Sequence, residues 1–183
     1  MILASQSPRR RELLSLITSD FRIIPAKGEE ALPEKITPEN AVLALSEQKA
    51  KEIYADYKGE IIIAADTIVA IDGKILGKPK DETDAFEMLK TLSGRVHEVF
   101  TGVCVIFPNG EKERFFDETK VEFYPLSDKE ISDYIKTGEP MDKAGAYGIQ
   151  EQGALLVKRI DGDYYNVMGL PVAKLFRVIN RIL

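Results

Sequence analysis

The sequence predicts an α/β fold in which helices cover a mixed β-sheet. Segments of strand and helix character alternate along the chain, which favours helices packed on the faces of a sheet. A strong hairpin signal at Asp72-Gly73 adds antiparallel strand pairs to that sheet. The 183 residues show no internal repeat or linker, and they suffice for one well-packed domain, or for one domain with two lobes.

Caps and turns mark the elements of the first half of the chain. A short apolar run at residues 2–4 leads into a helix that begins at Pro8, with Ser7 as its N-cap. A Thr-Pro pair at residues 37–38 begins a second helix, which runs to about residue 54. Strands are expected at residues 21–24, 60–71 and 74–77.

The second half continues the alternation. An amphipathic helix is expected at residues 81–92, and a capping box at Ser127 begins another helix that stops at Gly138. Strands are expected at residues 99–107, about 115–123 and 154–160, and Pro171 opens the final helix. Residues 141–148 show neither the helical period of apolar residues nor the alternation of a strand. We therefore expect an ordered functional loop there.

Composition excludes several classes of protein. A net charge of −5 argues against a general nucleic-acid coat, so a basic cluster at the N-terminus is a local feature. With only one cysteine, Cys104, and one histidine, His97, neither a disulfide framework nor a histidine-rich zinc site is possible, and both residues are expected to be structural. No apolar stretch is long enough to span a bilayer, and the N-terminal residues do not have the pattern of a signal peptide. We therefore expect a cytoplasmic protein without nucleic-acid or membrane partners.

The start of the first helix has the features of an anion site. Ser5 and Ser7 precede Arg9 and Arg10 in the first turn, where the helix dipole disfavours cations. Clustered guanidinium groups at a helix N-terminus suit a polyanion, most plausibly phosphate. The alternative is a solvated basic helix start, and we assign Arg11 to the surface.

Charged residues also interrupt apolar elements. Asp66 lies within the apolar strand at residues 60–71, where a carboxylate is costly unless it is paired, hydrogen-bonded or metal-bound; otherwise it is a strand-end carboxylate bonded to local backbone. Counting back from the hairpin turn places Thr67 opposite Lys78 and close to Asp66, unless a bulge shifts the register. The alternative for Lys78 is a solvated strand end. Lys49 projects from the apolar stripe of the second helix, and either snorkels outward or points into a cleft.

The late loop at residues 142–150 combines small residues with Lys, Tyr and Gln. Its glycines allow close approach of the backbone to a ligand, and Gln150 offers both a donor and an acceptor, which suits the reading of a base edge. Residues 169–171 form a tight strand-to-helix entry.

These segments together resemble the Maf family of nucleotide pyrophosphatases. The matching residues run in the family's order across nearly the whole chain: 3–10, 12–14, 30, 49–50, 65–69, 77–79, 92–94, 97, 101–102, 142–150 and 169–171. The resemblance implies one Maf-like domain over residues 1–183, with a three-layer α/β/α fold, a mixed sheet and a deep cleft. That fold is similar to the fold of inosine triphosphate pyrophosphatases.

The resemblance also implies an activity. Members cleave a nucleoside triphosphate between the α- and β-phosphates with a divalent metal, Mg²⁺ or Mn²⁺, and release the monophosphate and pyrophosphate. The form of the late loop is similar to the branch that acts on dTTP and UTP. Arg9, Thr67 and Gln150 match positions associated with substrate choice, and Asp66 matches the proposed proton acceptor. The chain departs from the family at Glu151, where glycine is common.

We therefore form a hypothesis of roles. Ser5, Ser7, Arg9 and Arg10 hold the phosphate chain, and Lys49 and Lys78 neutralise its charge. Glu30, with Asp66, binds the metal directly or through water, and Asp66 deprotonates the attacking water. The expected substrates are dTTP and UTP, with CTP or modified pyrimidine nucleotides as further candidates. The alternatives are a non-catalytic nucleotide-binding regulator of septum formation, and a pyrophosphatase for 7-methyl-GTP or another non-canonical nucleotide. A role in cell division arrest or in cleansing the nucleotide pool, and a homodimer, are expected from the family alone.

Overall fold

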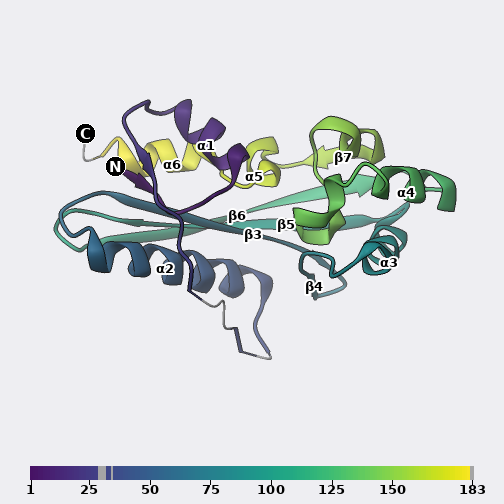
Figure 1. Ribbon diagram of the computed structural model, residues 1–183, viewed down its shortest axis with the longest axis horizontal. Helices are drawn as coiled ribbons and strands as arrows, with labels where there is room; N and C mark the ends of the chain where they lie inside the picture. Colours follow the sequence, from purple (N-terminus) through teal and green to yellow (C-terminus); the bar gives the residue numbers. More distant parts are fainter. Residues whose placement is uncertain (29–31, 34, 182–183) are drawn as a thin grey trace.

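A curved mixed sheet runs along the molecule with helices on both faces (Figure 1). The computed structural model describes residues 1–28, 32–33 and 35–181. In chain order the elements are β1 (Ile2–Leu3), α1 (Pro8–Ser15), β2 (Arg22–Ile23), α2 (Pro38–Asp56), β3 (Ile62–Ile71), β4 (Lys74–Leu76), α3 (Glu82–Leu92), β5 (Val96–Ile106), β6 (Lys112–Phe123), α4 (Asp128–Ile135), η1 (Glu139–Asp142), η2 (Ala144–Ala146), η3 (Glu151–Leu156), β7 (Val157–Asp161), α5 (Tyr164–Met168) and α6 (Val172–Ile179).

The strand order of the sheet is β2-β1-β3-β5-β6-β7, with β4 paired to β3. β1 runs parallel to both β2 and β3, and all the other described pairs are antiparallel. The predicted α/β class with a mixed sheet is confirmed. None of the described helices combines the length and the apolar character needed to cross a membrane.

One edge of β3 is left open in the middle of the sheet. β1 pairs with β3 only at residues 62–63, and β4 pairs with it only from residue 69 onward. Among the described residues no strand covers this edge between residues 64 and 68. We call this edge, with the end of β1 on one side and the end of β4 on the other, the notch. Ala4 N donates to the carbonyl of Ile63 here, so the carbonyls of Ala65 and Thr67 point to the same open edge by strand alternation.

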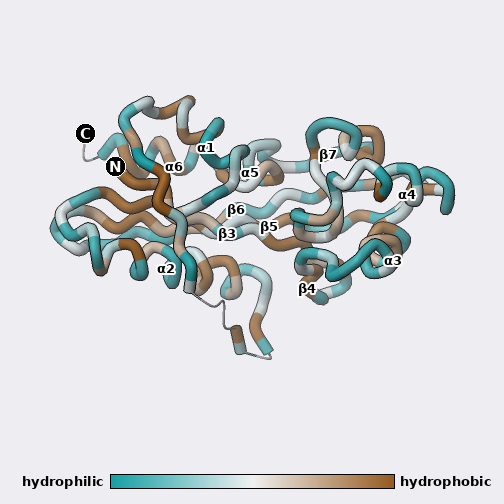
Figure 2. Tube along the Cα trace, viewed as in Figure 1, coloured by the Kyte–Doolittle hydropathy of each residue, from teal (hydrophilic) through white to brown (hydrophobic). Residues whose placement is uncertain are grey.

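The two faces of β3 pack against different helices. Its even-numbered residues belong to the α2 side, where Ile62 and Ala64 pack with Ala50 of α2. Its odd-numbered residues face the opposite layer, where Ile63 and Ala65 share a core with α1 and α6. Farther along the same face, β3 packs with α3 and α4. Figure 2 shows hydrophobic residues concentrated along these strands and the helix sides that face them.

Gly102 of β5 allows α2 to lie close against the sheet. A Cβ atom built on this glycine would lie 2.5 Å from the carbonyl carbon of Val42 and 2.9 Å from the nitrogen of Leu43, and closer still to the Val42 oxygen. Gly102 is also the β5 partner of Asp66. The close approach of α2 to β5 therefore occurs directly beside Asp66.

The late part of the chain differs from the prediction. The expected strand at residues 154–160 is a 3-10 segment followed by β7, and residues 139–146 contain two short 3-10 helices. α4 ends at Ile135 rather than at Gly138. The sequence analysis also missed α5, which Asp163 caps by accepting a hydrogen bond from Tyr165 N. Residues 169–171 therefore join two helices, and their interpretation as a strand-to-helix entry is wrong. A five-residue helix is too short to show a helical period.

Candidate functional site

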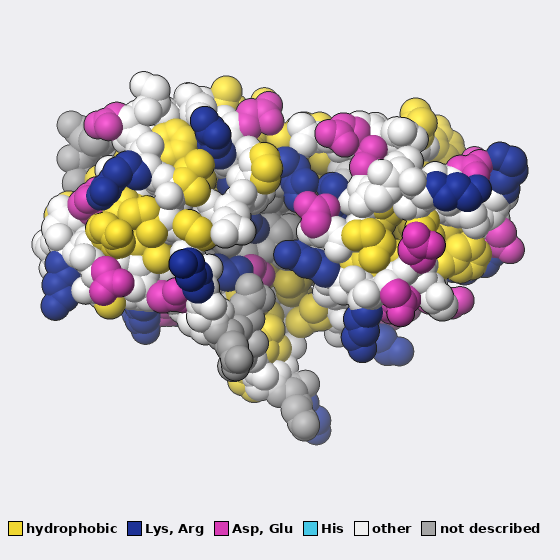
Figure 3. Space-filling model, in the orientation of Figure 1, with side chains coloured by type: hydrophobic (Ala, Val, Ile, Leu, Met, Phe, Trp, Pro, Cys, Tyr) yellow, Lys and Arg dark blue, Asp and Glu magenta, His cyan; other side chains and the backbone are white. Residues whose placement is uncertain are grey.

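The molecule is hollowed over the middle of the sheet, at the notch. Figure 3 shows this hollow between the α1 side and the turns of residues 139–156, with basic and acidic side chains gathered around it. The predicted site residues that the structure describes come from the turn after β1, from α1, from α2, from β3, and from the loops after β4 and η2. The contacts among these residues show which of them the fold brings together.

Arg10 fastens the start of α1 to the rest of the site. Its guanidinium donates to the carbonyl of Gly169 (2.8 Å), to Thr67 Oγ1 (3.0 Å) and to Ser5 Oγ (3.3 Å). Ser7 caps the helix as predicted, because its hydroxyl accepts from Arg10 N, and Ser7 N donates to Ser5 Oγ. The serine-rich turn is thus tied to β3 and to the α5–α6 junction.

Thr67 begins a chain of buried hydrogen bonds that the sequence analysis missed. Its hydroxyl lies 2.8 Å from the hydroxyl of Thr101 on β5, which in turn lies 2.8 Å from the carbonyl of Asn166 on α5. The Asn166 amide donates to Thr119 Oγ1 and to the Val99 carbonyl. Thr101, Thr119 and Asn166 are fully buried. A threonine in a strand and an asparagine in a short helix carry no local signal of such a contact.

Lys49 forms an ion pair with Asp66 on the other face of β3. The distance between Lys49 Nζ and Asp66 Oδ1 is 2.5 Å, and the two side chains are 19% and 12% exposed. A carboxylate at this depth needs a partner, and α2 supplies it. Lys49 therefore points toward the sheet, and the snorkelling alternative is wrong.

Asp66 and Thr67 are consecutive strand residues, so their side chains leave β3 on opposite faces. The Asp66–Lys49 pair belongs to the α2 layer, and the Thr67–Arg10 contact belongs to the α1 layer. The two groups of residues meet only at the open edge of the strand. A ligand that contacts both must lie in the notch and straddle that edge.

Lys78 does not lie opposite Thr67. The hairpin register is as predicted, with Ile71 facing Lys74, but the pairing ends where Val69 faces Leu76. The chain then turns toward η2, where Gly145 N donates to the Gly77 carbonyl. Lys78 is exposed just beyond this turn.

Arg9 connects the start of α1 with the late loop by its charge. Burial raises the pKa of Asp142, but the hydrogen-bonded Lys143 ammonium and the charge of Arg9 lower it more, so the net shift is downward. Arg9 is half-buried. Gln150 is also half-buried and precedes η3. The structure records no hydrogen bond or ion pair from Lys78 or Gln150 to Asp66 or Thr67 among the described residues.

Glu30 lies outside the described residues. The described part of the chain contains no group of three or more His, Cys, Asp or Glu side chains arranged to hold a metal ion. Mg²⁺ is usually bound through one or two carboxylates together with substrate phosphates. Asp66, a buried carboxylate at the notch, is of the residue type that can supply one such ligand.

His97 and Cys104 are structural, as expected. His97 is fully buried between Phe123 and Tyr147, with its Nε2 atom 2.8 Å from the Tyr147 hydroxyl. Burial lowers the pKa of His97 to about 4, and burial raises the pKa of the Cys104 thiol to about 11. Neither group is charged near neutral pH.

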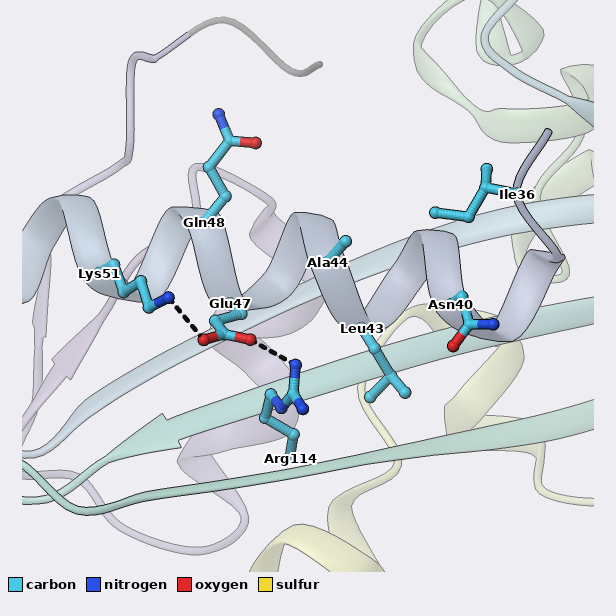
Figure 4. Close-up of a pocket in the computed structure, with 8 residues that line it drawn as sticks. All are labelled: Ile36, Asn40, Leu43, Ala44, Glu47, Gln48, Lys51 and Arg114. Carbon is cyan, nitrogen blue, oxygen red and sulfur yellow. Dashed lines mark hydrogen bonds and ion pairs between the residues drawn. The ribbon is translucent and has the colours of Figure 1, made fainter. Parts of the chain in front are cut away.

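A groove of about 580 Å³ runs along α2 beside Arg114 of β6, outside the predicted site (Figure 4). Glu47 lies at its base, paired with Lys51, Lys112 and Arg114. The hydrogen bonds from Lys112 and Lys51 hold the pKa of Glu47 at about 2. The carboxylate is thus fully engaged in joining α2 to β6.

The fold and the site place the chain among the Maf-like proteins. The model of that family matches residues 1–182, and the chain belongs to the family. It is 56% identical over 176 residues to the dTTP/UTP pyrophosphatase of Carboxydothermus hydrogenoformans, covering 96% of this chain and 94% of that protein. It is 54% identical over 179 residues to the dTTP/UTP pyrophosphatase of Bacillus velezensis, covering 98% and 94%.

A solved structure supports the fold independently. A HAM1 protein from Coxiella burnetii superimposes with a TM-score of 0.53 over 98% of each chain, at 15% sequence identity. At that identity the likeness shows a shared fold alone.

Proposed function

We propose that the chain hydrolyses dTTP and UTP between the α- and β-phosphates, releasing the nucleoside monophosphate and pyrophosphate. The observation that carries the proposal is the Asp66–Lys49 pair at the notch, across β3 from the serine–arginine start of α1. The identity of 56% to a dTTP/UTP pyrophosphatase over nearly the full length supports the choice of nucleotides. Cytoplasmic location, homodimer formation and a link to cell division stay predictions.

In this proposal the α1 side receives the phosphate chain. Arg9 and the first turn of α1 offer positive charge and backbone donors at a helix start. Arg10 orients Ser5 and Thr67 through its bonds to them. Lys78 is exposed just beyond β4, and we propose that it neutralises charge on the phosphate chain.

On the α2 side Asp66 orients and deprotonates the attacking water. Lys49 has three N–H donors, so one ammonium can hold Asp66 and a phosphate oxygen together. Asp66, with Glu30 of the undescribed segment, would hold Mg²⁺ or Mn²⁺. A bound divalent cation would supply neutralisation of the negative charge on the phosphate oxygens.

The test is a product analysis with dTTP, UTP, CTP, GTP and 7-methyl-GTP, using the wild-type protein and Asp66→Asn. Loss of a general base costs on the order of 10² to 10⁴ in rate, so the variant should release pyrophosphate at least about a hundredfold more slowly. Asp72→Asn is the matched control, because Asp72 is exposed in the hairpin turn at a positive φ of 51° that asparagine tolerates.

Each outcome has a distinct meaning. Nucleoside diphosphate and orthophosphate as products would refute cleavage between the α- and β-phosphates. Full activity in Asp66→Asn would refute the assignment of the base. Tight nucleotide binding without turnover by the wild-type protein would favour the non-catalytic regulator, and preferential cleavage of 7-methyl-GTP would favour that alternative.

A further inference from the structure

The buried hydrogen-bond chain behind Thr67 fixes the direction of its proton. Thr101 Oγ1 lies 2.8 Å from the carbonyl oxygen of Asn166, and a carbonyl oxygen only accepts. The proton between these two oxygens must therefore belong to Thr101. A hydroxyl has one proton, so Thr101 has none left for Thr67.

The contact between the two threonines then has one donor. Thr67 Oγ1 and Thr101 Oγ1 are 2.8 Å apart, and a separation that short requires a proton between them. Because the Thr101 proton is directed to Asn166, Thr67 donates to Thr101. The Arg10 guanidinium, which has donors only, occupies one of the two acceptor positions on Thr67 Oγ1.

The half-buried hydroxyl of Thr67 is left with one lone pair and no proton for a ligand in the notch. A phosphate oxygen without a proton is a poor partner for a lone pair, whereas an N–H group is a good one. Uracil and thymine carry an N–H at ring position 3, where cytosine of the same size carries a lone pair. The hydroxyl can thus distinguish these bases.

We propose that Thr101 is a positioning residue for substrate selection. It holds the Thr67 hydroxyl as an acceptor, so that the notch favours a base with an imide N–H over a base with an acceptor at that position. The proposal rests on the proposed function, because it takes a pyrimidine nucleotide as the ligand. It assigns to Thr101 and Asn166 a role that acts through Thr67 and involves no contact with the substrate.

The experiment measures binding, so that it does not depend on turnover. Calorimetry with the α,β-methylene analogues of UTP and CTP gives the ratio of their affinities for each variant. The wild-type protein should favour the uridine analogue at least about tenfold, because an unpaired polar group inside a site costs on that scale. Thr101→Val removes the acceptor for the Thr67 proton, which can then turn to the ligand, and the preference should fall to about twofold or less.

Two controls separate positioning from stability. Thr101→Ser keeps the hydroxyl and should keep the preference. Thr119→Val removes another fully buried hydroxyl of the same network, bonded to the Asp163 carbonyl and the Asn166 amide but not to Thr67. It should lower stability and leave the ratio of affinities unchanged.

The proposal is overturned if the wild-type protein binds both analogues equally, or if its preference survives in Thr101→Val. A preference that falls equally in Thr119→Val would also overturn it, because the effect would then be one of general packing. Failure of pyrophosphate release, with the binding preferences as expected, would contradict the proposed function and leave this inference standing.

Discussion

Replacement of Gly102 by alanine should separate α2 from the sheet at the site. The new Cβ atom would lie 2.5 Å from the Val42 carbonyl carbon, whereas ordinary contacts begin at 3.4 Å, so α2 must retreat by about 0.9 Å (3.4 − 2.5). The obstructing atoms are backbone, so no side-chain rotation relieves the clash. Overpacking costs about 1–3 kcal/mol, and a rigid helix places this substitution near the upper value. The same retreat would lengthen the distance between Lys49 Nζ and Asp66 Oδ1 from 2.5 Å to about 3.4 Å (2.5 + 0.9), which weakens the ion pair.

Urea and thermal unfolding would measure the loss. At roughly 2–4 °C per kcal/mol for a chain of this length, about 3 kcal/mol lowers the melting temperature by roughly 6–12 °C. Gly77→Ala is the matched stability control, because a Cβ atom at that glycine meets no atom within 4 Å. Equal melting temperatures for the two variants would refute the reasoning. The pyrophosphatase activity of Gly102→Ala should also fall, because the contact between Lys49 and Asp66 is weakened.

Three single substitutions test a close contact, a buried histidine and a backbone angle. Gly169→Ala should reduce nucleotide affinity and stability. The position has a φ of +110°, and a Cβ atom there would lie 3.3 Å from Thr67 Oγ1 and 3.4 Å from Arg10 Nε. Binding of the UTP analogue equal to that of the wild-type protein would contradict this prediction. Burial lowers the pKa of His97 from 6.5 to about 4, so only the unfolded state takes up this proton as the pH falls from 6.5 to 4. Roughly 3 kcal/mol of stability should be lost over that window at 1.36 kcal/mol per pKa unit, and urea unfolding of His97→Gln should show a correspondingly shallower pH dependence, whereas parallel curves would exclude His97 as the cause. Glu151→Gly should raise the free energy of unfolding by up to about 1 kcal/mol, because Glu151 holds a φ of +54° that glycine adopts without strain. A decrease of about 0.5 kcal/mol or more, typical of glycine at an ordinary exposed position, would show that the strain is absent.

Local physical chemistry was enough to predict several parts of the site. The cost of a buried carboxylate predicted a partner for Asp66, but the hairpin register pointed to Lys78 rather than Lys49 as the lysine beside it. The structure pairs Asp66 with Lys49. The cap at Ser7 was equally predictable, because a serine before proline at a helix start is a local pattern.

The missed features depend on contacts between distant segments. The register argument for Lys78 used only the hairpin, and it could not include the Gly145–Gly77 hydrogen bond through which the late loop meets the end of β4. Thr101 resembles any β-branched strand residue, and only its register opposite Thr67 brings the two hydroxyls together. The whole-chain family resemblance predicted the class of fold well, because it combined segments whose spatial relation no single segment encodes.

The placement of Asp66 and Thr67 on consecutive positions of one strand has a consequence for how substrate preference can diverge. The Cα atoms of Asp66 and Thr67 are one peptide unit apart, so their spacing along β3 stays constant when either helical layer shifts. Substitutions behind Thr67 can therefore alter which base is accepted while the carboxylate stays in register with the reacting phosphate. With the proposed roles, related chains could acquire new nucleotide preferences through substitutions behind Thr67 while Asp66 and Lys49 stay unchanged on the other face of β3.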